Sequence, residues 1–140
     1  MDNPLIKVPR LLPVAEKVNQ LRRQVESELR SFDIIRWSGT PYGEHPLQTM
    51  DIHEVNDLCP RDGWPTVLCI HGGGWVEGDK SQFIALLPRF ARKKIMATSM
   101  NYRLAPEVTW KEQVADVLQA IDFIRSQQVD TKRIALWATS

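Results

Sequence analysis

The residues best suited to chemistry in this 140-residue chain form the run His71-Gly72-Gly73-Gly74-Trp75. Three successive glycines lack Cβ atoms, so their backbone can adopt positive φ angles and bring N–H groups against a ligand. Fixed N–H donors stabilise the negative charge that develops on a carbonyl oxygen during acyl transfer, each contributing about 3 to 4 kcal/mol. A plain glycine-rich turn is the simpler interpretation. The bracketing of three glycines by His and Trp favours an oxyanion hole.

A nucleotide-binding P-loop is a competing interpretation of the same region. Gly73 and Gly78 have the required spacing, and Lys80-Ser81 follow. Asp79 is inserted between Gly78 and Lys80, however, so the G-x-x-x-x-G-K-[ST] pattern fails by one residue. The insertion turns the lysine by about 100° around a helix start and puts a carboxylate where phosphate oxygens should bind. Nucleotide binding is therefore the weaker interpretation.

Ser140 is the second candidate for chemistry, because it ends the apolar segment RIALWATS. A nucleophile elbow places its serine on a strained strand-to-helix turn, with small residues two positions before and after it. Ala138 fills the first of these positions. The pattern alone also fits a helix N-cap. The order of glycine loop, strand, helix and strand ending in serine favours a nucleophile.

The elements that must position these residues alternate between strand and helix. Apolar residues spaced by three or four predict helices, and short apolar or alternating runs predict strands. The expected helices are 13–30, 81–92 (which contains Pro88) and 109–128, and the expected strands are 32–37, 48–55, 66–70, 93–103 and 133–140. The first two strands are expected to pair with each other. Such alternation predicts an α/β fold with a mostly parallel central sheet flanked by helices and preceded by an amphipathic N-terminal helix.

Composition narrows the range of partners. The net charge is only +1, from 18 Lys and Arg against 17 Asp and Glu, which gives no electrostatic reason to expect nucleic acid or a membrane as partner. Cys59 and Cys69 fit neither a C-x-x-C redox motif nor a zinc-knuckle spacing, so free thiols are expected. No apolar run is long enough to cross a bilayer and no signal-peptide core is evident, so a cytoplasmic location is expected.

Two motifs in order carry a resemblance to a known superfamily. The run 71–75 with Gly78, then Asn101-Tyr102-Arg103-Leu104-Ala105-Pro106-Glu107, Asp116 and the strand ending at Ser140, resembles the HGGGW and YRLAPE signatures of α/β-hydrolases. The groups most similar are hormone-sensitive-lipase-like carboxylesterases, feruloyl and acetyl-xylan esterase-like proteins, and kynurenine formamidase-like hydrolases. The resemblance implies that 1–31 is an N-terminal helical segment and 32–140 a partial α/β-hydrolase domain, the N-terminal half of the fold.

The resemblance also implies a role for each site residue. Ser140 would be the nucleophile, and the backbone N–H groups of Gly73 and Gly74 would form most of the oxyanion hole. The residues expected to shape the loop are His71, Gly72 and Trp75, and His71 is not the general base. The implied reaction is acyl transfer from a small-molecule carboxylic ester, with no metal or organic cofactor.

Four further residues match positions that brace the loop and the following helix in these hydrolases: Arg103, Pro106, Glu107 and Asp116. An ion pair of Arg103 with Asp116 or with Glu107 is the corresponding hypothesis.

All three histidines precede Ser140. In this fold the acidic and histidine partners follow the serine, so the 140 residues look truncated at the nucleophile elbow and are expected to be inactive alone. A non-catalytic fragment or binding module is the alternative from another class, and an arylformamidase-type amide hydrolase is a more remote one. The choice among ester, acetylated sugar and formamide substrates stays open, as does the oligomeric state.

Overall fold

The computed structural model describes residues 14–30 and 34–140. Most of the expected elements form, some with shifted ends. In chain order they are α1 (Val14–Arg30), β1 (Ile34–Pro41), β2 (Thr49–Val55), β3 (Trp64–Ile70), the 3₁₀ helix η1 (Lys80–Phe83), α2 (Leu87–Ala91), β4 (Met96–Met100), α3 (Trp110–Arg125) and β5 (Val129–Ala138).

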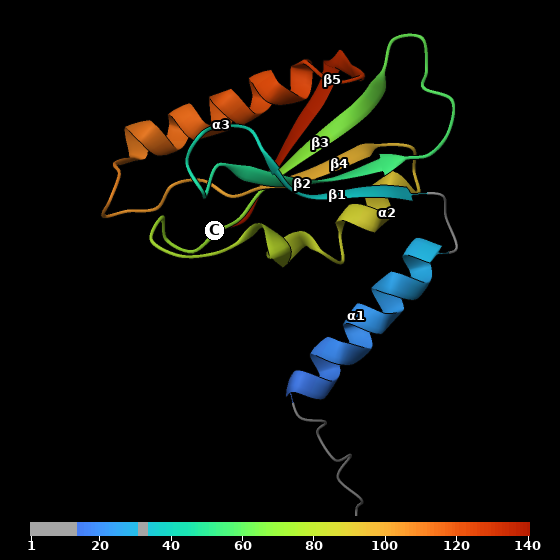
Figure 1. Ribbon diagram of the computed structural model, residues 1–140, viewed down its shortest axis with the longest axis horizontal. Coiled ribbons are helices and arrows are strands. Elements are labelled where there is room, and N and C mark those ends of the chain that lie inside the picture. Colours follow the sequence, from blue (N-terminus) through green and yellow to red (C-terminus); the bar gives the residue numbers. More distant parts are fainter. Residues whose placement is uncertain (1–13, 31–33) are drawn as a thin grey trace, which may run out of the picture.

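The five strands form one sheet in the order β1-β2-β4-β3-β5 (Figure 1). The β1–β2 and β2–β4 pairs are antiparallel, whereas β4–β3 and β3–β5 are parallel. The expectation of a mostly parallel sheet is therefore wrong, because the sheet is mixed. A short loop joins β1 to β2, which permits only an antiparallel pair, while the crossovers through α2 and α3 return the chain in a parallel direction.

The helix expected over 81–92 is also wrong as a single element. The chain forms η1 first and the five-residue α2 afterwards, with Pro88 in the first turn of α2. Proline has no N–H to donate and its ring collides with the carbonyl four residues earlier, so one continuous helix cannot run through this position. Proline is tolerated in the first turn, where the N–H has no intrahelical partner.

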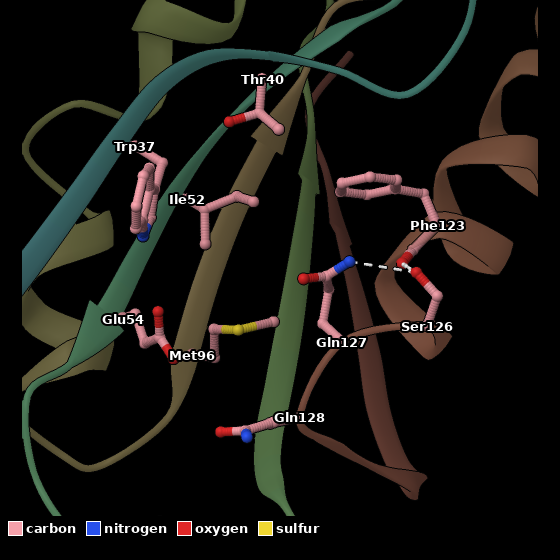
Figure 2. Close-up of a pocket in the computed structure, with 9 residues that line it drawn as sticks. All are labelled: Trp37, Thr40, Ile52, Glu54, Met96, Phe123, Ser126, Gln127 and Gln128. Atoms are coloured by element: carbon pink, nitrogen blue, oxygen red, sulfur yellow. Dashed lines mark hydrogen bonds between the residues drawn. The ribbon is translucent and has the colours of Figure 1, made fainter.

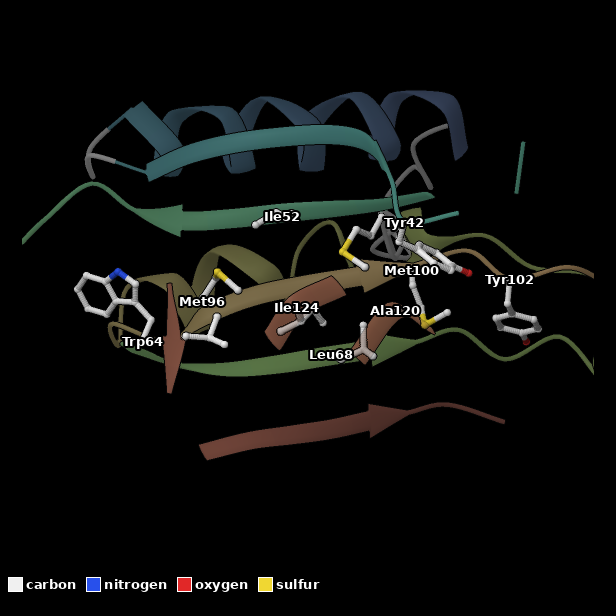
Figure 3. Close-up of a cluster of buried hydrophobic side chains, with 11 residues drawn as sticks. Tyr42, Ile52, Trp64, Leu68, Met96, Met100, Tyr102, Ala120 and Ile124 are labelled. Carbon is white, nitrogen blue, oxygen red and sulfur yellow. The ribbon is translucent and has the colours of Figure 1, made fainter. Parts of the chain in front are cut away.

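The hydrophobic core lies in two layers, one on each face of the sheet. Along β3, Leu68 belongs to the cluster on the α3 side (Figure 3), whereas Val67 and Cys69 belong to the cluster on the α2 side. This follows from the alternation of side chains along a strand. Helix α3 begins with a capping box formed by Thr109 and Glu112, which satisfies backbone N–H groups at the helix start. The packed sheet and α3 thus hold the starting points of the loops that follow β3 and β4 in fixed positions.

Helix α1 forms where the apolar spacing predicts it, on the α2 side of the sheet (Figure 1). Among its described side chains Val25 is buried, whereas Val18 and Leu21 are about half exposed (50% and 46%). Its packing as an amphipathic helix therefore stays a prediction. Within residues 14–30 and 34–140 no helix combines the length and apolar character needed to span a bilayer.

Candidate active site

The glycine loop begins where β3 ends, and His71 holds its first residues in place. The His71 imidazole is buried and stacks on the Tyr102 ring, with centroids 4.4 Å apart and ring planes 12° from parallel. The Tyr102 hydroxyl donates to the His71 carbonyl at 2.9 Å, and His71 Nδ1 lies 2.8 Å from the Gly72 carbonyl oxygen. These contacts occupy the His71 backbone carbonyl and ring Nδ1, so they hold His71 against Tyr102 and Gly72. Its role in shaping an oxyanion loop stays a prediction.

Gly72 and Gly73 occupy positions where a side chain does not fit. A Cβ on Gly72 would lie 2.5 Å from the Ser140 carbonyl carbon, and one on Gly73 would lie 2.1 Å from the Glu77 carbonyl oxygen. Gly73 also has φ +128°, a conformation that other residues rarely adopt. The loop can therefore approach the end of β5 and fold back on itself only because these residues are glycines.

The end of β5 is fastened directly to this loop. The Gly72 N–H donates to Thr139 Oγ1 at 2.8 Å, and the Thr139 N–H donates to the Ile70 carbonyl at 3.1 Å. The C-terminal end of the described chain accordingly lies beside the loop after β3 (Figure 1). Sequence reasoning missed Thr139, because a threonine between two small residues carries no pattern that predicts a contact 67 positions away.

A cavity of about 160 Å³ opens between the loop and the end of β5. Its lining residues are His71, Gly72, Gly73, Gly74, Trp75, Tyr102, Thr139 and Ser140. All six residues singled out from the sequence thus line one cavity, and the backbone N–H groups of Gly73 and Gly74 have no acceptor among the described residues. The roles of Ser140 as nucleophile and of the glycines as oxyanion hole stay predictions.

A polar network that sequence reasoning did not find supports the far side of the loop. Asn101 accepts from the Lys80 N–H at 2.7 Å and donates to the Asp79 carboxylate at 2.9 Å. Lys80 Nζ lies 3.0 Å from Asp51 Oδ1 on β2, and both side chains are largely buried. The only signal in the sequence was the Asp79-Lys80 pair that disrupts the P-loop pattern. Its function in the fold is to tie the loop to β2 and β4.

The hypothesis of an ion pair between Arg103 and Asp116 is confirmed. Arg103 Nη2 lies 2.7 Å from Asp116 Oδ1, and the Asp116 side chain is fully buried. The Arg103 carbonyl accepts from Gln113 Nε2, which also donates to the Trp75 carbonyl at 2.9 Å. The pair therefore reaches the glycine loop through Gln113.

The electrostatics of these supports follow from their hydrogen bonds. Burial acts to raise the pKa of Asp116, but the hydrogen bonds and charge of Arg103 outweigh it and hold that pKa below its usual range. The pKa of Asp79 is lowered in the same way, with burial opposed by hydrogen bonds from Asn101 and Ser81. Both carboxylates are thus charged at neutral pH and function as structural anchors.

The other two histidines do not reach this cavity. His45 Nδ1 accepts from the Leu47 N–H in the loop between β1 and β2. His53 lies on β2 in the core, where burial and then the charge of Arg36 lower its pKa to about 4. Among the described residues, no three His, Cys, Asp or Glu side chains gather closely enough to hold a metal ion. Both cysteines are free, as expected.

Comparison with known protein families identifies this arrangement. Residues 50–140, which include the glycine loop, the Arg103–Asp116 pair and β5, match the BD-FAE family. The chain belongs to the BD-FAE family. The resemblance to HGGGW-type α/β-hydrolases is thereby confirmed over most of the chain.

Curated relatives of this BD-FAE chain are named as hydrolases. It is 34% identical over 86 residues to Esterase LipC of Mycobacterium tuberculosis, covering 61% of this chain and 21% of LipC. It is 30% identical over 101 residues to Kynurenine formamidase of Debaryomyces hansenii, covering 68% of this chain and 33% of that enzyme. The chain thus spans about a fifth to a third of the length of these relatives.

Solved structures agree on the fold. The crystal structure of esterase B from Lactobacillus rhamnosis superposes with a TM-score of 0.66 at 23% identity, covering 91% of this chain and 43% of the esterase. At that level of identity the similarity establishes a shared α/β-hydrolase fold. Ester hydrolysis is the activity that the names of these relatives have most in common.

Proposed function

We propose that the complete protein carrying this sequence is a serine esterase and that Ser140 is its nucleophile. The observation that carries the proposal is the hydrogen bond from the Gly72 N–H to Thr139 Oγ1, which fixes the glycine loop against the segment after β5 that contains Ser140. Gly73, Gly74 and Ser140 consequently line one small cavity. A hydroxyl and backbone N–H groups around one space are the groups that acyl transfer requires, which supports the proposal.

The proposed mechanism has two steps. Ser140 Oγ attacks the ester carbonyl while a histidine outside these 140 residues takes its proton, and the Gly73 and Gly74 N–H groups stabilise the oxyanion. Collapse of the tetrahedral intermediate expels the alcohol, which receives the proton from that histidine, and leaves an acyl-enzyme. Water activated by the same histidine then releases the acid. A metal ion has no part in this scheme.

The 140 residues alone are proposed to be inactive. His71 is held by Tyr102 and by the Gly72 carbonyl, and His53 lies on β2 in the core, so neither is placed to accept the Ser140 proton. A serine hydroxyl without a base is a poor nucleophile at neutral pH.

Hydrolysis of p-nitrophenyl acetate by the complete protein tests the proposal. We expect Ser140→Ala to lower kcat by at least about a thousandfold with unchanged folding, and a fluorophosphonate probe to label Ser140 but not the alanine variant. Thr131→Ala, which removes an exposed hydroxyl from β5 outside the cavity, is the control. Full activity in Ser140→Ala would refute the assignment and leave a non-catalytic binding module as the better description.

The relative named kynurenine formamidase favours amide hydrolysis as a second candidate, because it matches over 68% of this chain. Esters and formamides pass through the same type of tetrahedral oxyanion, so the described residues suit both. The ratio of kcat/KM for an aryl ester to that for the matching N-formyl aryl amine would separate them. A higher kcat/KM for the formamide than for the ester would identify an amide as the preferred substrate.

A further inference from the structure

A second and larger cavity, of about 460 Å³, lies on the α3 face of the sheet. It lies at the opposite end of β4 from the glycine loop. Its lining includes Met96, the first residue of β4, whereas Asn101, which supports the glycine loop, follows the last residue of β4. Figure 2 shows it lined by side chains from β1, β2, β4, the C-terminal end of α3 and the segment that follows α3. Its volume falls within the range of small-molecule binding sites in proteins.

Two aromatic rings form opposite walls of this second cavity. Trp37 projects from β1 on one side and Phe123 from α3 on the other, with Ile52 and Met96 between them (Figure 2). The Trp37 side chain is 54% exposed, so its ring is available to a ligand. The faces of aromatic rings carry partial negative charge and attract cations, most strongly for tryptophan. The apolar floor provides contact for methyl or methylene groups.

The charge of the residues that line the second cavity also favours a cation as ligand. Glu54 is the one charged residue among the described residues that line the cavity, and it makes no ion pair or hydrogen bond with another described residue. Across the strand pair it lies opposite Ile35, which cannot neutralise it. The carboxylate therefore lacks a counter-ion from the described residues at this cavity.

The C-terminal end of α3 adds to the same negative field. Ser126 caps the helix and donates to the Phe123 carbonyl at 2.6 Å, while Gln127 Nε2 donates to Ser126 Oγ at 3.0 Å. The end of a helix carries a partial negative charge from its aligned carbonyl groups. The Gln127 donor is used within this cap, which leaves its side-chain carbonyl oxygen as an acceptor beside the cavity.

We propose that this cavity binds a small organic cation, a substituted ammonium compound, with Trp37 and Phe123 on either side of the charge and Glu54 as its counter-ion. The inference is independent of the proposed esterase function, because the cavity shares no residue with the active-site cavity. A bound cation would give Glu54 a counter-ion that the described residues do not supply, and its alkyl groups would lie on Ile52 and Met96.

The proposal is tested with choline and 3,3-dimethyl-1-butanol, its uncharged isostere, titrated calorimetrically into the complete protein. We expect choline to bind and the isostere to bind at least about tenfold more weakly. Trp37→Leu is expected to weaken choline binding between about twofold and thirtyfold, the range of one cation–π contact. Glu54→Gln keeps the shape of the side chain and removes only its charge, so it should weaken binding without disturbing the fold.

Trp110→Leu and Glu44→Gln serve as matched controls, since both residues are exposed and lie outside the cavity. They should leave choline binding unchanged. The proposal is overturned if choline and its isostere bind equally, which would make the cavity a site for neutral ligands. It is equally overturned if no choline binding is detected in the millimolar range, or if the Trp37 and Glu54 variants bind like the controls.

Discussion

Replacing Asp116 by alanine is expected to destabilise the protein by about 3 to 5 kcal/mol, the cost of removing one partner of a buried ion pair. The Asp116 carboxylate is fully buried and accepts from Arg103 N at 2.9 Å, Arg103 Nη2 at 2.7 Å and Gln48 Nε2 at 2.8 Å. Alanine at this position would leave the guanidinium without its carboxylate and would remove the nearer of two acceptors of the Gln48 amide, the other being Gln119 Oε1 at 3.3 Å. The loss therefore exceeds that of an ordinary hydrogen bond, about 1 kcal/mol.

The same helix provides a matched control. Asp122 on α3 lies 3.9 Å from Arg125, and its side chain is 78% exposed. Exposed pairs of this kind contribute at most about 0.5 kcal/mol. Urea unfolding of the complete protein, followed by circular dichroism, should give a large fall in midpoint for Asp116→Ala and almost none for Asp122→Ala, with similar slopes.

A double variant tests whether the cost comes from the unpaired charge. Arg103→Met combined with Asp116→Leu replaces both partners by apolar side chains of similar size, and it should be more stable than either single variant. The pH dependence has a defined sign as well. The pKa of Asp116 is lowered in the folded state, so its contribution is present above about pH 4 and is lost as the pH falls through the folded value. Equal midpoints for Asp116→Ala and Asp122→Ala would refute the bracing role.

Three other outcomes follow from the structure. His53 has a folded pKa of about 4 against 6.5 for the free side chain, so stability should fall by about 3 kcal/mol between pH 6.5 and 4. In His53→Phe this dependence should flatten, and an unchanged pH profile in urea unfolding would contradict the assignment. Thr139→Val removes the acceptor for the Gly72 N–H and should lower kcat of the proposed ester hydrolysis about tenfold or more, whereas Thr139→Ser keeps the acceptor. Equal kcat values for the two variants would argue against this positioning role. Gly72→Ala puts a Cβ 2.5 Å from the Ser140 carbonyl. It should lower kcat and destabilise the protein by about 1 to 3 kcal/mol, measured by the kcat assay and by urea unfolding.

Sequence reasoning recovered the elements whose signals are local. The spacing of apolar residues predicts α3, because a helix repeats its buried face every 3.6 residues regardless of what covers it. The unbroken apolar run that ends at Ile70 predicts a buried strand, and the three glycines after it predict a loop with unusual backbone angles. Arg103 was expected to pair with Asp116 or Glu107, and the structure shows the pair with Asp116.

Only the tertiary structure decided how these elements meet. The apolar residues of a strand do not indicate its direction in the sheet. The sheet is mixed because β2 pairs with β4 in the antiparallel direction, which only the structure reveals. The contacts of Thr139 with Gly72 and of Gln48 with Asp116 join positions 67 and 68 residues apart. The local sequence determines the spacing of apolar residues, the turns and the helix caps, because these depend only on residues that are neighbours in the chain. Long-range contacts depend on which faces meet when the whole chain packs, and no short segment contains that information.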